Sequence, residues 1–590
     1  MHADEEGGGR LALLAEAASE VASTEHESAV EPEAGTGTGS EPTRVSGGSR
    51  VSGVSEVRRV ADLVAAIGEI EAASSPRWIW VDTARVYPDL LRAGVRIARC
   101  HDVVLVDEIL AARAGLFGAP RTLGAAYARL YDLPVPDVGR MTAATEAVGG
   151  GGPQQDALFS PDETGLPAEV DPLDALIEVY LAQLPELDAG GPRLRLLAAA
   201  ESAGALAAAE MTHAGLPLDP ELHSAHLTEV LGPMPAFSGA ASGARPAKLQ
   251  DLVDRVAEAF NTPALNPDSP TQLLKALSTN GLPAHTTRAW ELRGFEHPGV
   301  PLLLEYKELA RLYSANGWTW LRAWVRDGRF RPEYVVGGVV TGRWASRGGG
   351  ALQLPAMVRR AVVADPGWTF VVADAGQLEP RVLAAISGDR GLAEAARAED
   401  LYTELSDVFG GDRAKAKLGL LGAMYGQTSG EVGPLLVTLR RRFPRAIGLV
   451  DDAAKAGIEG RVVHTRLGRA CPPPSPRWLR LVGGADGEVK ADQVRHDRGR
   501  FTRNFVVQGS AAEWALALIA TLRQKLVGTS AELVFFLHDE VVMHCEESDA
   551  EQVRTAVTES ALESARLVFG QSPVRFPLHL ATVQCYADAK

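Results

Sequence analysis

The sequence has few cysteines and few aromatic residues, and nothing in it is spaced to bind zinc. Four of the 590 residues are cysteines, without a CxxC pair or a suitably spaced histidine. They are Cys100, Cys471, Cys545 and Cys585. This scatter excludes a disulfide scaffold and is typical of a protein in a reducing compartment.

A signal sequence and a long apolar run are also lacking. The chain begins MHADEE, which is acidic where a signal peptide is basic, and we find no apolar run that approaches membrane-spanning length. These absences predict a cytoplasmic protein that does not contact a membrane.

Positive charge is scarce overall, since the formal net charge is −16. Residues 1–57 alone carry 11 acids and 3 arginines, which is about half of the excess. Basic clusters occur elsewhere, at 440–445 and at 495–503. Because a local basic groove is enough to bind phosphates, the total charge does not exclude nucleic acid as a partner.

The length and composition predict several domains. With 590 residues, 46% of them hydrophobic, the chain is too long for one core. We expect a flexible acidic tail at 1–57 with a possible helix at 11–21, a small α/β domain at 58–145, a linker at 146–170 and a largely helical part at 171–590. Helices are predicted at 193–214, 271–280 and 302–316, and an inserted loop at 472–497.

Two predicted strands end in carboxylates. Residues 533–544 read LVFFLHDEVVMH, two β-rich runs around Asp539 and Glu540 at a tight turn. A second strand, 368–373, is followed by Asp374, and a helix follows in which Pro380 is tolerable because the first turn has spare N–H groups. One sheet can bring Asp374 and Asp539 side by side. Such a pair can hold two divalent cations for phosphoryl transfer.

Between these acids lies a basic helix. Arg413, Lys417, Leu421 and Tyr425 recur every four residues and therefore share one side. Cations at a helix N-terminus oppose the helix dipole unless an anion lies there, and a triphosphate is such an anion. A solvated amphipathic helix is the alternative.

With these residues the chain resembles the family A DNA polymerases of the bacterial DNA polymerase I type. The family's motif D-Y-S-Q-I-E-L-R is similar to residues 374–381, DAGQLEPR. R-x-x-x-K-x-x-x-F-x-x-x-Y-G is similar to 413–426, and V-H-D-E to 537–540. Residues 341–343 (TGR) and 504–512 (NFVVQGSAA) match two supporting motifs. The chain departs from the family at Ala375, Gly376, Pro380, Leu420 and Leu421, and we expect these departures to affect fidelity and sugar selectivity more than the chemistry.

The resemblance implies a multidomain α/β protein with a right-hand polymerase fold over 171–590: an antiparallel-sheet palm with helical thumb and fingers. A small α/β RNase H-like 3′–5′ exonuclease remnant at 58–145 precedes it. The implied activity is template-directed addition of deoxynucleoside triphosphates to a primer 3′-OH, in DNA repair or replication, by a monomer that binds primer–template DNA. A phage-type single-subunit RNA polymerase and a polymerase with an active 3′–5′ exonuclease remain alternatives.

The resemblance also assigns roles to individual residues. Two Mg²⁺ ions, which Mn²⁺ can replace, are held by Asp374, Asp539 and the carbonyl of Ala375. Glu540 and Lys417 complete the catalytic group. The nucleotide-binding set is Arg413, Lys417, Leu421, Tyr425, Gln377, Glu379 and His538. The DNA-binding set is Arg343, Arg500, Asn504 and Gln508.

The 58–145 domain lacks an acid pair that the exonuclease needs. The strand at 77–81 is followed by Asp82-Thr83-Ala84 without the expected Asp-x-Glu, and the Asp4-Glu5-Glu6 run has no apolar strand before it. We therefore expect a domain that keeps the fold but does not cut DNA.

Overall fold

The computed structural model describes residues 2–3, 9–14, 54–136, 165–235, 245–347, 350, 354–427, 431–484 and 488–589. It divides into two compact units, residues 1–111 with 116–189, and residues 112–115 with 190–590. Most of the expected linker lies outside the described residues. Helix α6 (Pro172–Ala189), which we expected to begin the long C-terminal part, belongs to the first unit.

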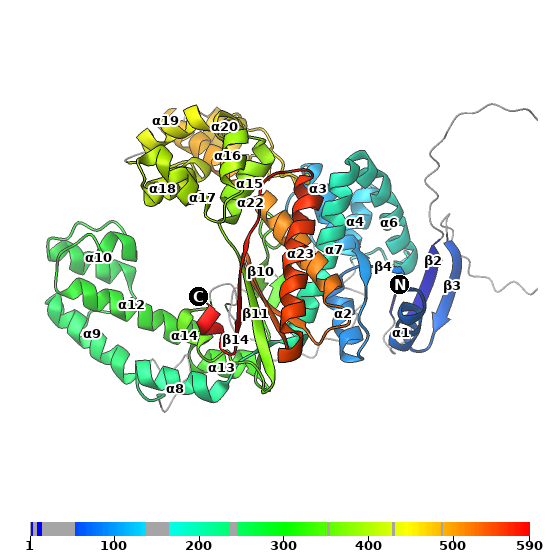
Figure 1. Ribbon diagram of the computed structural model, residues 1–590, viewed down its shortest axis with the longest axis horizontal. Coiled ribbons are helices and arrows are strands. Elements are labelled where there is room, and N and C mark those ends of the chain that lie inside the picture. The colour runs from blue at the N-terminus through cyan, green and yellow to red at the C-terminus, as the bar shows by residue number, and fades with distance from the viewer. Residues whose placement is uncertain are drawn as a thin grey trace, which may run out of the picture. The chain divides into compact units, whose positions relative to one another are not determined.

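The first unit contains two small sheets and several helices (Figure 1). Strands β1 (His2–Ala3), β2 (Gly9–Leu14) and β3 (Val54–Val60) form an antiparallel sheet, and β4 (Arg77–Trp80) pairs in parallel with β5 (Arg99–Asp102). The helices of this part of the chain are α1 (Leu63–Ser74), α2 (Thr83–Arg92), α3 (Val103–Arg113), α4 (Leu123–Leu130) and α6. The predicted α/β alternation after residue 57 is confirmed.

One sequence expectation fails in this unit. The possible helix at 11–21 is wrong over Leu11–Leu14, which lie in β2 paired with β3, so part of the expected flexible tail belongs to a sheet. The apolar run after Asp102 is helix α3, because Asp102 ends β5 and accepts the N–H of Leu105 in the first helical turn. Asp4, Glu5 and Glu6 lie outside the described residues.

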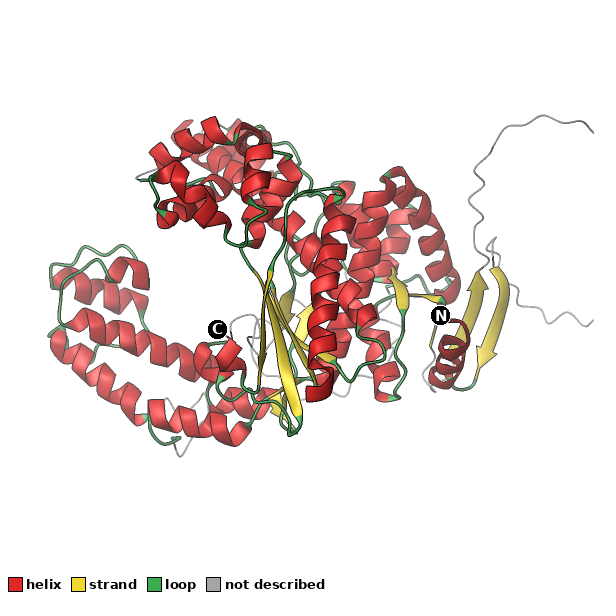
Figure 2. Cartoon of the chain, viewed as in Figure 1, coloured by secondary structure: helices red, strands yellow, loops and turns green. Residues whose placement is uncertain are grey.

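The second unit is organised around an antiparallel sheet with the strand order β12-β13-β11-β14 (Figure 2). The strands are β11 (Trp368–Ala375), β12 (Glu532–Leu537), β13 (Glu540–Glu546) and β14 (Leu578–Val583). Alternate residues of β11 face opposite sides. Phe370 and Val372 join a core with Phe535 and Tyr586, while helix α23 (Ala550–Phe569) packs on the strands as well.

A first group of helices in this unit precedes β11. They are α7 (Gly191–Ala214), α8 (Pro220–Leu231), α9 (Ala247–Ala259), α10 (Pro270–Thr279), α11 (Ala289–Leu292), α12 (Gly299–Asn316), α13 (Trp318–Trp324) and α14 (Ala356–Arg359). Short strands β6 (Leu216–Pro217), β7 (Val325–Arg326), β8 (Arg329–Phe330), β9 (Glu333–Val335) and β10 (Ala345–Arg347) lie among them. Residues of α9, α10 and α12 share a separate small core around Phe260 and Leu303. The three helices predicted in this region are confirmed.

A second group of helices lies between β11 and β12 in the sequence. They are α15 (Leu378–Ser387), α16 (Arg390–Ala395), α17 (Leu401–Ser406), α18 (Arg413–Tyr425), α19 (Val432–Arg442), α20 (Pro444–Ile458), α21 (Pro476–Gly483) and α22 (Glu488–Lys525). The loop expected at 472–497 is wrong over most of its length. Ser475 caps α21 by accepting the N–H of Trp478, and Pro476 at the first helical position favours a helix.

Helix α22 corrects a further expectation. Among the described residues, its Lys490–Lys525 stretch is long enough for a membrane span and includes an 18-residue window of mean hydropathy 1.5. The sequence alone led us to expect no such run. Since 83% of that window is buried in the protein, α22 has the character of a core helix.

Candidate active site

The structure brings Asp374 and Asp539 to the same end of the four-stranded sheet. Asp374 lies opposite Glu540 in the β11–β13 register, and His538 and Asp539 form the two-residue turn between β12 and β13. The backbone N–H of Ala375 donates to the carbonyl of Asp539 at 3.1 Å. This backbone bond ties the strand end to the turn, so the positions of the two acids are fixed relative to each other.

The oxygen atoms here suit a magnesium site that is completed by a ligand. The described residues contain no group of three or more His, Cys, Asp or Glu side chains that could enclose a metal. Two carboxylates and the carbonyl of Ala375 are hard oxygen donors. Mg²⁺ commonly takes one or two carboxylates and fills its other positions with water and substrate phosphates. The donor set therefore fits Mg²⁺ bound together with a phosphate ligand.

Glu540 is held inside the protein beside these acids. Its side chain is 2% exposed, it accepts a hydrogen bond from the Tyr586 hydroxyl, and Arg359 lies 3.6 Å away. Burial, and then the charge of Glu540, raise the pKa of Tyr586 above its usual range. Through these contacts Glu540 anchors the hairpin that carries Asp539.

Helix α18 presents its cations as the sequence predicted. Arg413, Lys415 and Lys417 are exposed, and Leu421 is half-buried one turn further on. The helix begins after Asp412, whose carboxylate accepts the N–H of Lys415 at 3.0 Å. The negative charge of Asp412 lies at the positive end of the helix dipole and offsets the nearby cations. A bound triphosphate is therefore not the only explanation for cations at this end of the helix.

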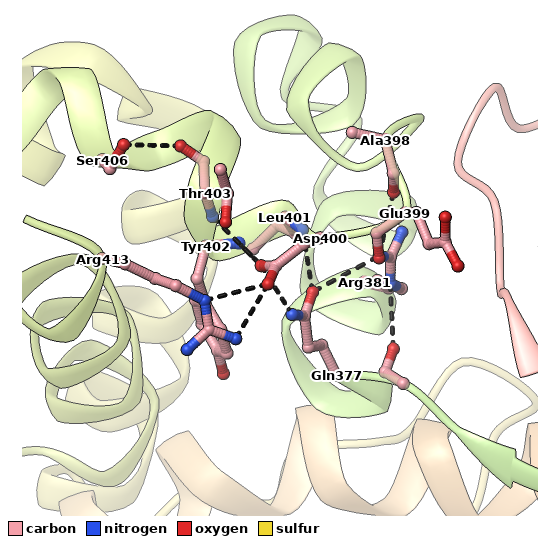
Figure 3. Close-up of polar contacts among 11 residues, drawn as sticks. Gln377, Arg381, Ala398, Glu399, Asp400, Leu401, Tyr402, Thr403, Ser406 and Arg413 are labelled. Atoms are coloured by element: carbon pink, nitrogen blue, oxygen red, sulfur yellow. Dashed lines mark hydrogen bonds and ion pairs between the residues drawn. The ribbon is translucent and has the colours of Figure 1, made fainter. Parts of the chain in front are cut away.

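A second anion, Asp400, binds Arg413 directly (Figure 3). Its Oδ2 accepts a hydrogen bond from Arg413 Nη2 at 2.8 Å. Its Oδ1 accepts from the backbone N–H of Thr403 at 3.0 Å and from Gln377 Nε2 at 2.8 Å. Burial favours a raised pKa for Asp400, but these hydrogen bonds outweigh it and lower the pKa to about 2. The Arg413 guanidinium also lies 5.6 Å from the centre of the Tyr402 ring.

Gln377 and Arg381 connect the strand end to these helices. The Gln377 Oε1 accepts the N–H of Leu401 at 2.9 Å. The Gln377 amide therefore links the start of α15 to the start of α17 and does not project freely toward a nucleotide. Arg381 is fully buried and donates to the carbonyls of Gly376, Ala396 and Glu399, among others. Figure 3 shows both side chains between the end of β11 and α17.

Glu379 joins three of the sequence motifs. Its Oε1 accepts from Arg343 Nη2 and its Oε2 from the Tyr425 hydroxyl, each at 2.5 Å. Burial and this hydrogen bond raise the pKa of Tyr425 above its usual range. Arg343 is thus paired with an acid here, whereas the sequence assigned it to DNA.

The remaining predicted residues lie on α22 and at the hairpin turn. Arg500, Asn504 and Gln508 recur every four residues on α22, and Arg500 pairs with Asp497 at 2.5 Å. Asn504 Oδ1 is buried without a hydrogen bond among the described residues. His538 lines a small cavity with Arg343, and burial lowers the pKa of its imidazole.

Two nearby residues were not predicted from the sequence. Asp400 lies 13 positions before Arg413, and only the turn between α17 and α18 makes the two meet. His579 lies on β14 directly opposite Asp374. No local pattern marks either residue, because both contacts depend on the tertiary fold.

The fold of this part of the chain is that of a polymerase palm with its associated helices. The model of DNA polymerase family A matches residues 240–580, more than half of the chain, and the chain belongs to this family.

Individual relatives match part of their own length. The thermostable DNA polymerase I of Thermus filiformis is 30% identical over 300 residues, which is 45% of this chain and 34% of the relative. DNA polymerase I of Helicobacter pylori strain J99 is 25% identical over 340 residues, 52% of this chain and 36% of the relative. The chain thus spans about a third of the length of these curated relatives.

A solved structure extends the likeness in fold. The POL domain of Pol1 from M. smegmatis, in complex with DNA primer-template and dNTP, superposes with a TM-score of 0.68 at 20% identity. The match covers 90% of this chain and 91% of that one. It supports the fold of the described chain.

Proposed function

We propose that this chain is a template-directed DNA polymerase that adds deoxynucleoside triphosphates to a primer 3′-OH. The observation that carries the proposal is the fixed pair of Asp374 and Asp539, tied through the Ala375–Asp539 backbone bond, together with the exposed cations of α18. Membership of DNA polymerase family A agrees with it.

The proposed chemistry asks the protein mainly to position and neutralise charge. Asp374, Asp539 and the Ala375 carbonyl would hold two Mg²⁺ ions, which would activate the attacking oxygen and stabilise the leaving group when bound. Lys417 binds the triphosphate and donates a proton to the leaving pyrophosphate. Arg413 gives up part of its ion pair with Asp400 so that its guanidinium binds the same phosphates.

Other residues border the base pair and the duplex. Glu379, held by Arg343 and Tyr425, occupies the space that a ribose 2′-OH needs, and Leu421 flanks the base. Arg500, Asn504 and Gln508, which share one side of α22, donate to minor-groove acceptors that all base pairs present.

Primer extension tests this proposal and its alternative. The full chain is incubated with a primer–template, Mg²⁺ and either four deoxynucleotides or four ribonucleotides. We expect extension with deoxynucleotides that EDTA abolishes. Extension that prefers ribonucleotides would instead support the RNA polymerase alternative, and no extension with either set would overturn both.

We also propose that residues 58–145 are an exonuclease-like remnant that does not cut DNA. The acids of this part have structural partners: Asp82 caps α2, Asp107 pairs with Arg129, and Asp102 accepts two backbone N–H groups. The test is a labelled primer with a mismatched 3′ end, incubated with Mg²⁺ or Mn²⁺ without nucleotides. Shortening that survives Asp374→Ala and disappears with Asp102→Ala would show an active nuclease.

A further inference from the structure

His579 shares the site with the two acids. It lies opposite Asp374 in the antiparallel β11–β14 register, and residues directly opposite each other in such a pair project from the same face of the sheet. Their Cβ atoms are then about 5 Å apart. His579 therefore projects on the face that carries Asp374.

Gly376, one of the departures from the family motif, makes room for this imidazole. A Cβ at Gly376 would lie 2.8 Å from His579 Nε2 and 3.3 Å from Cδ2, so the exposed ring would have to shift to admit a side chain there. The family motif has serine at this position. Gly376 and His579 thus form a matched pair, since the ring occupies space that a serine side chain needs.

The backbone around this pair is held in place. The N–H of Gly376 donates to the carbonyl of Pro577 at 3.1 Å, and Arg381 donates to the carbonyl of Arg575 at 3.1 Å. The His579 side chain is exposed, and no hydrogen bond to its ring occurs among the residues that the structure describes. A fixed strand thus carries an accessible imidazole with an N–H to donate.

The position of the ring beside Gly376 indicates its partner. Gly376 leads from β11 to Gln377, which binds Asp400, and Asp400 binds Arg413 at the start of α18. Because His579 Nε2 lies beside Gly376, the imidazole lies where the chain leaves β11 toward the cationic helix. In the proposed function this is the side of the triphosphate tail.

We propose that His579 donates an N–H hydrogen bond to the pyrophosphate part of the incoming nucleotide, and that Gly376 is required for this contact. The inference rests on the proposed function and deepens it. The pyrophosphate oxygens are present in the bound nucleotide, in the transition state and in the product. An interaction of this kind lowers the KM for nucleotide and tightens product binding while leaving kcat nearly unchanged.

The first experiment measures equilibrium binding of inorganic pyrophosphate, with Mg²⁺, to the full chain on a primer–template with a dideoxy end. His579→Ala is expected to weaken binding about tenfold, and His579→Gln, which keeps an N–H donor, about twofold. The KM for deoxynucleotide should rise by the same factors with kcat within about twofold. Unchanged binding by His579→Ala, or equal losses in both variants, would overturn the contact.

A double-mutant cycle separates donation from space filling. Gly376→Ser should displace the ring and weaken pyrophosphate binding about as much as His579→Ala, and the double variant should lose no more than either. If His579 merely fills space, the double variant His579→Ala/Gly376→Ser will bind pyrophosphate as tightly as the original chain does. Thermal unfolding of each variant verifies that it is folded.

The results also distinguish this contact from the proposed function. A chain that binds pyrophosphate through His579 but extends no primer overturns the polymerase assignment and leaves the contact standing. A chain that extends primers equally well with and without His579, at the same KM, overturns the contact alone. Failure of the original chain to bind pyrophosphate overturns the contact as well.

Discussion

The protein places acids at the ends of neighbouring strands twice, and the two arrangements differ in how soon a helix begins after each acid. Asp82 follows the parallel strand β4 by two residues, Asp102 is the last residue of β5, and the two acids stand directly before helices α2 and α3. Asp374 is followed by Ala375 in the same strand, and α15 begins only at Leu378.

This difference decides what the carboxylates do. Asp82 Oδ1 accepts the N–H of Ala84 at 2.9 Å, and Asp102 accepts from Thr83 at 2.7 Å and Leu105 at 3.0 Å. Asp102 is only 1% exposed, whereas Asp374 and Asp539 are half-buried. An acid that caps the next helix has its oxygens committed to backbone amides. A strand-end acid becomes a candidate metal ligand when the helix starts later.

The largest expected effect tests the comparison directly. Asp374→Ala or Asp539→Ala should reduce primer extension by about a thousandfold or more, because each removes a proposed metal ligand. Primer–template binding should change little. The matched variant Asp82→Ala should leave extension within about twofold. Extension by either palm variant within about tenfold of the original chain contradicts the two-metal assignment.

A smaller effect is expected at α18. Lys417→Ala should lower kcat/KM for nucleotide by about a hundredfold, and Lys417→Arg by about tenfold, since Arg keeps the charge but not its compact geometry. Lys415→Ala is the control, because Lys415 is exposed on the same helix and its Nζ lies 3.5 Å from the N-cap Asp412. Equal losses of kcat/KM in Lys415→Ala and Lys417→Ala would show that the total positive charge of the helix matters, and not the position of Lys417.

Glu379 should control sugar selectivity through its size. Glu379→Ala removes the side chain held by Arg343 and Tyr425, and should raise ribonucleotide use relative to deoxynucleotide use by about tenfold or more. Glu379→Gln keeps the volume and should preserve discrimination. Incorporation of each sugar is measured in parallel. An unchanged ratio in Glu379→Ala means that another residue excludes the ribose 2′-OH, in a pocket that Pro380 or Leu421 has reshaped.

Local signals explain which parts of the site the sequence could predict. Helix α18 was expected to run from Arg413 into Tyr425-Gly426 and does so, because Asp412 caps its start and Gly426 takes the left-handed conformation at its end. Helix α21 was missed because the prolines of its region were read as loop residues, although Pro476 directly follows the N-cap Ser475.

Contacts set by the register and by tertiary packing could not be predicted. His579 meets Asp374 only because β14 pairs with β11 in one register, across about two hundred residues of sequence. The Arg343–Glu379 pair and the burial of Glu540 against Tyr586 likewise join distant segments. Sequence spacing within one element carries no information on such pairs.

A separate effect, on stability and not on catalysis, is expected in the first unit. Burial, with a further contribution from Asp82, raises the pKa of Asp102 from 3.8 to about 7, against hydrogen bonds that lower it. In the unfolded chain this group titrates near its ordinary value of about 3.9. Between these two values the folded protein binds a proton that the unfolded chain has released. Stability therefore falls as the pH rises from about 4 to about 7, by a few kcal/mol, and then levels off.

Asp102→Asn should remove most of this pH dependence, because an amide does not titrate. Unfolding in urea is followed at pH 5 to 8 by pulsed hydrogen exchange of peptides from β4 and β5, so that this unit is observed separately. Asp62→Asn is the control, since Asp62 is an exposed N-cap of α1 whose Oδ1 accepts from Ala65, and Asn caps equally well. It should keep the original slope. If Asp102→Asn keeps that slope too, Asp102 is ionised in the folded protein near neutral pH. The contrast with Asp374 and Asp539 would then rest only on burial and on how soon a helix begins, because the acid pair of the first unit would carry the charge that a metal site requires.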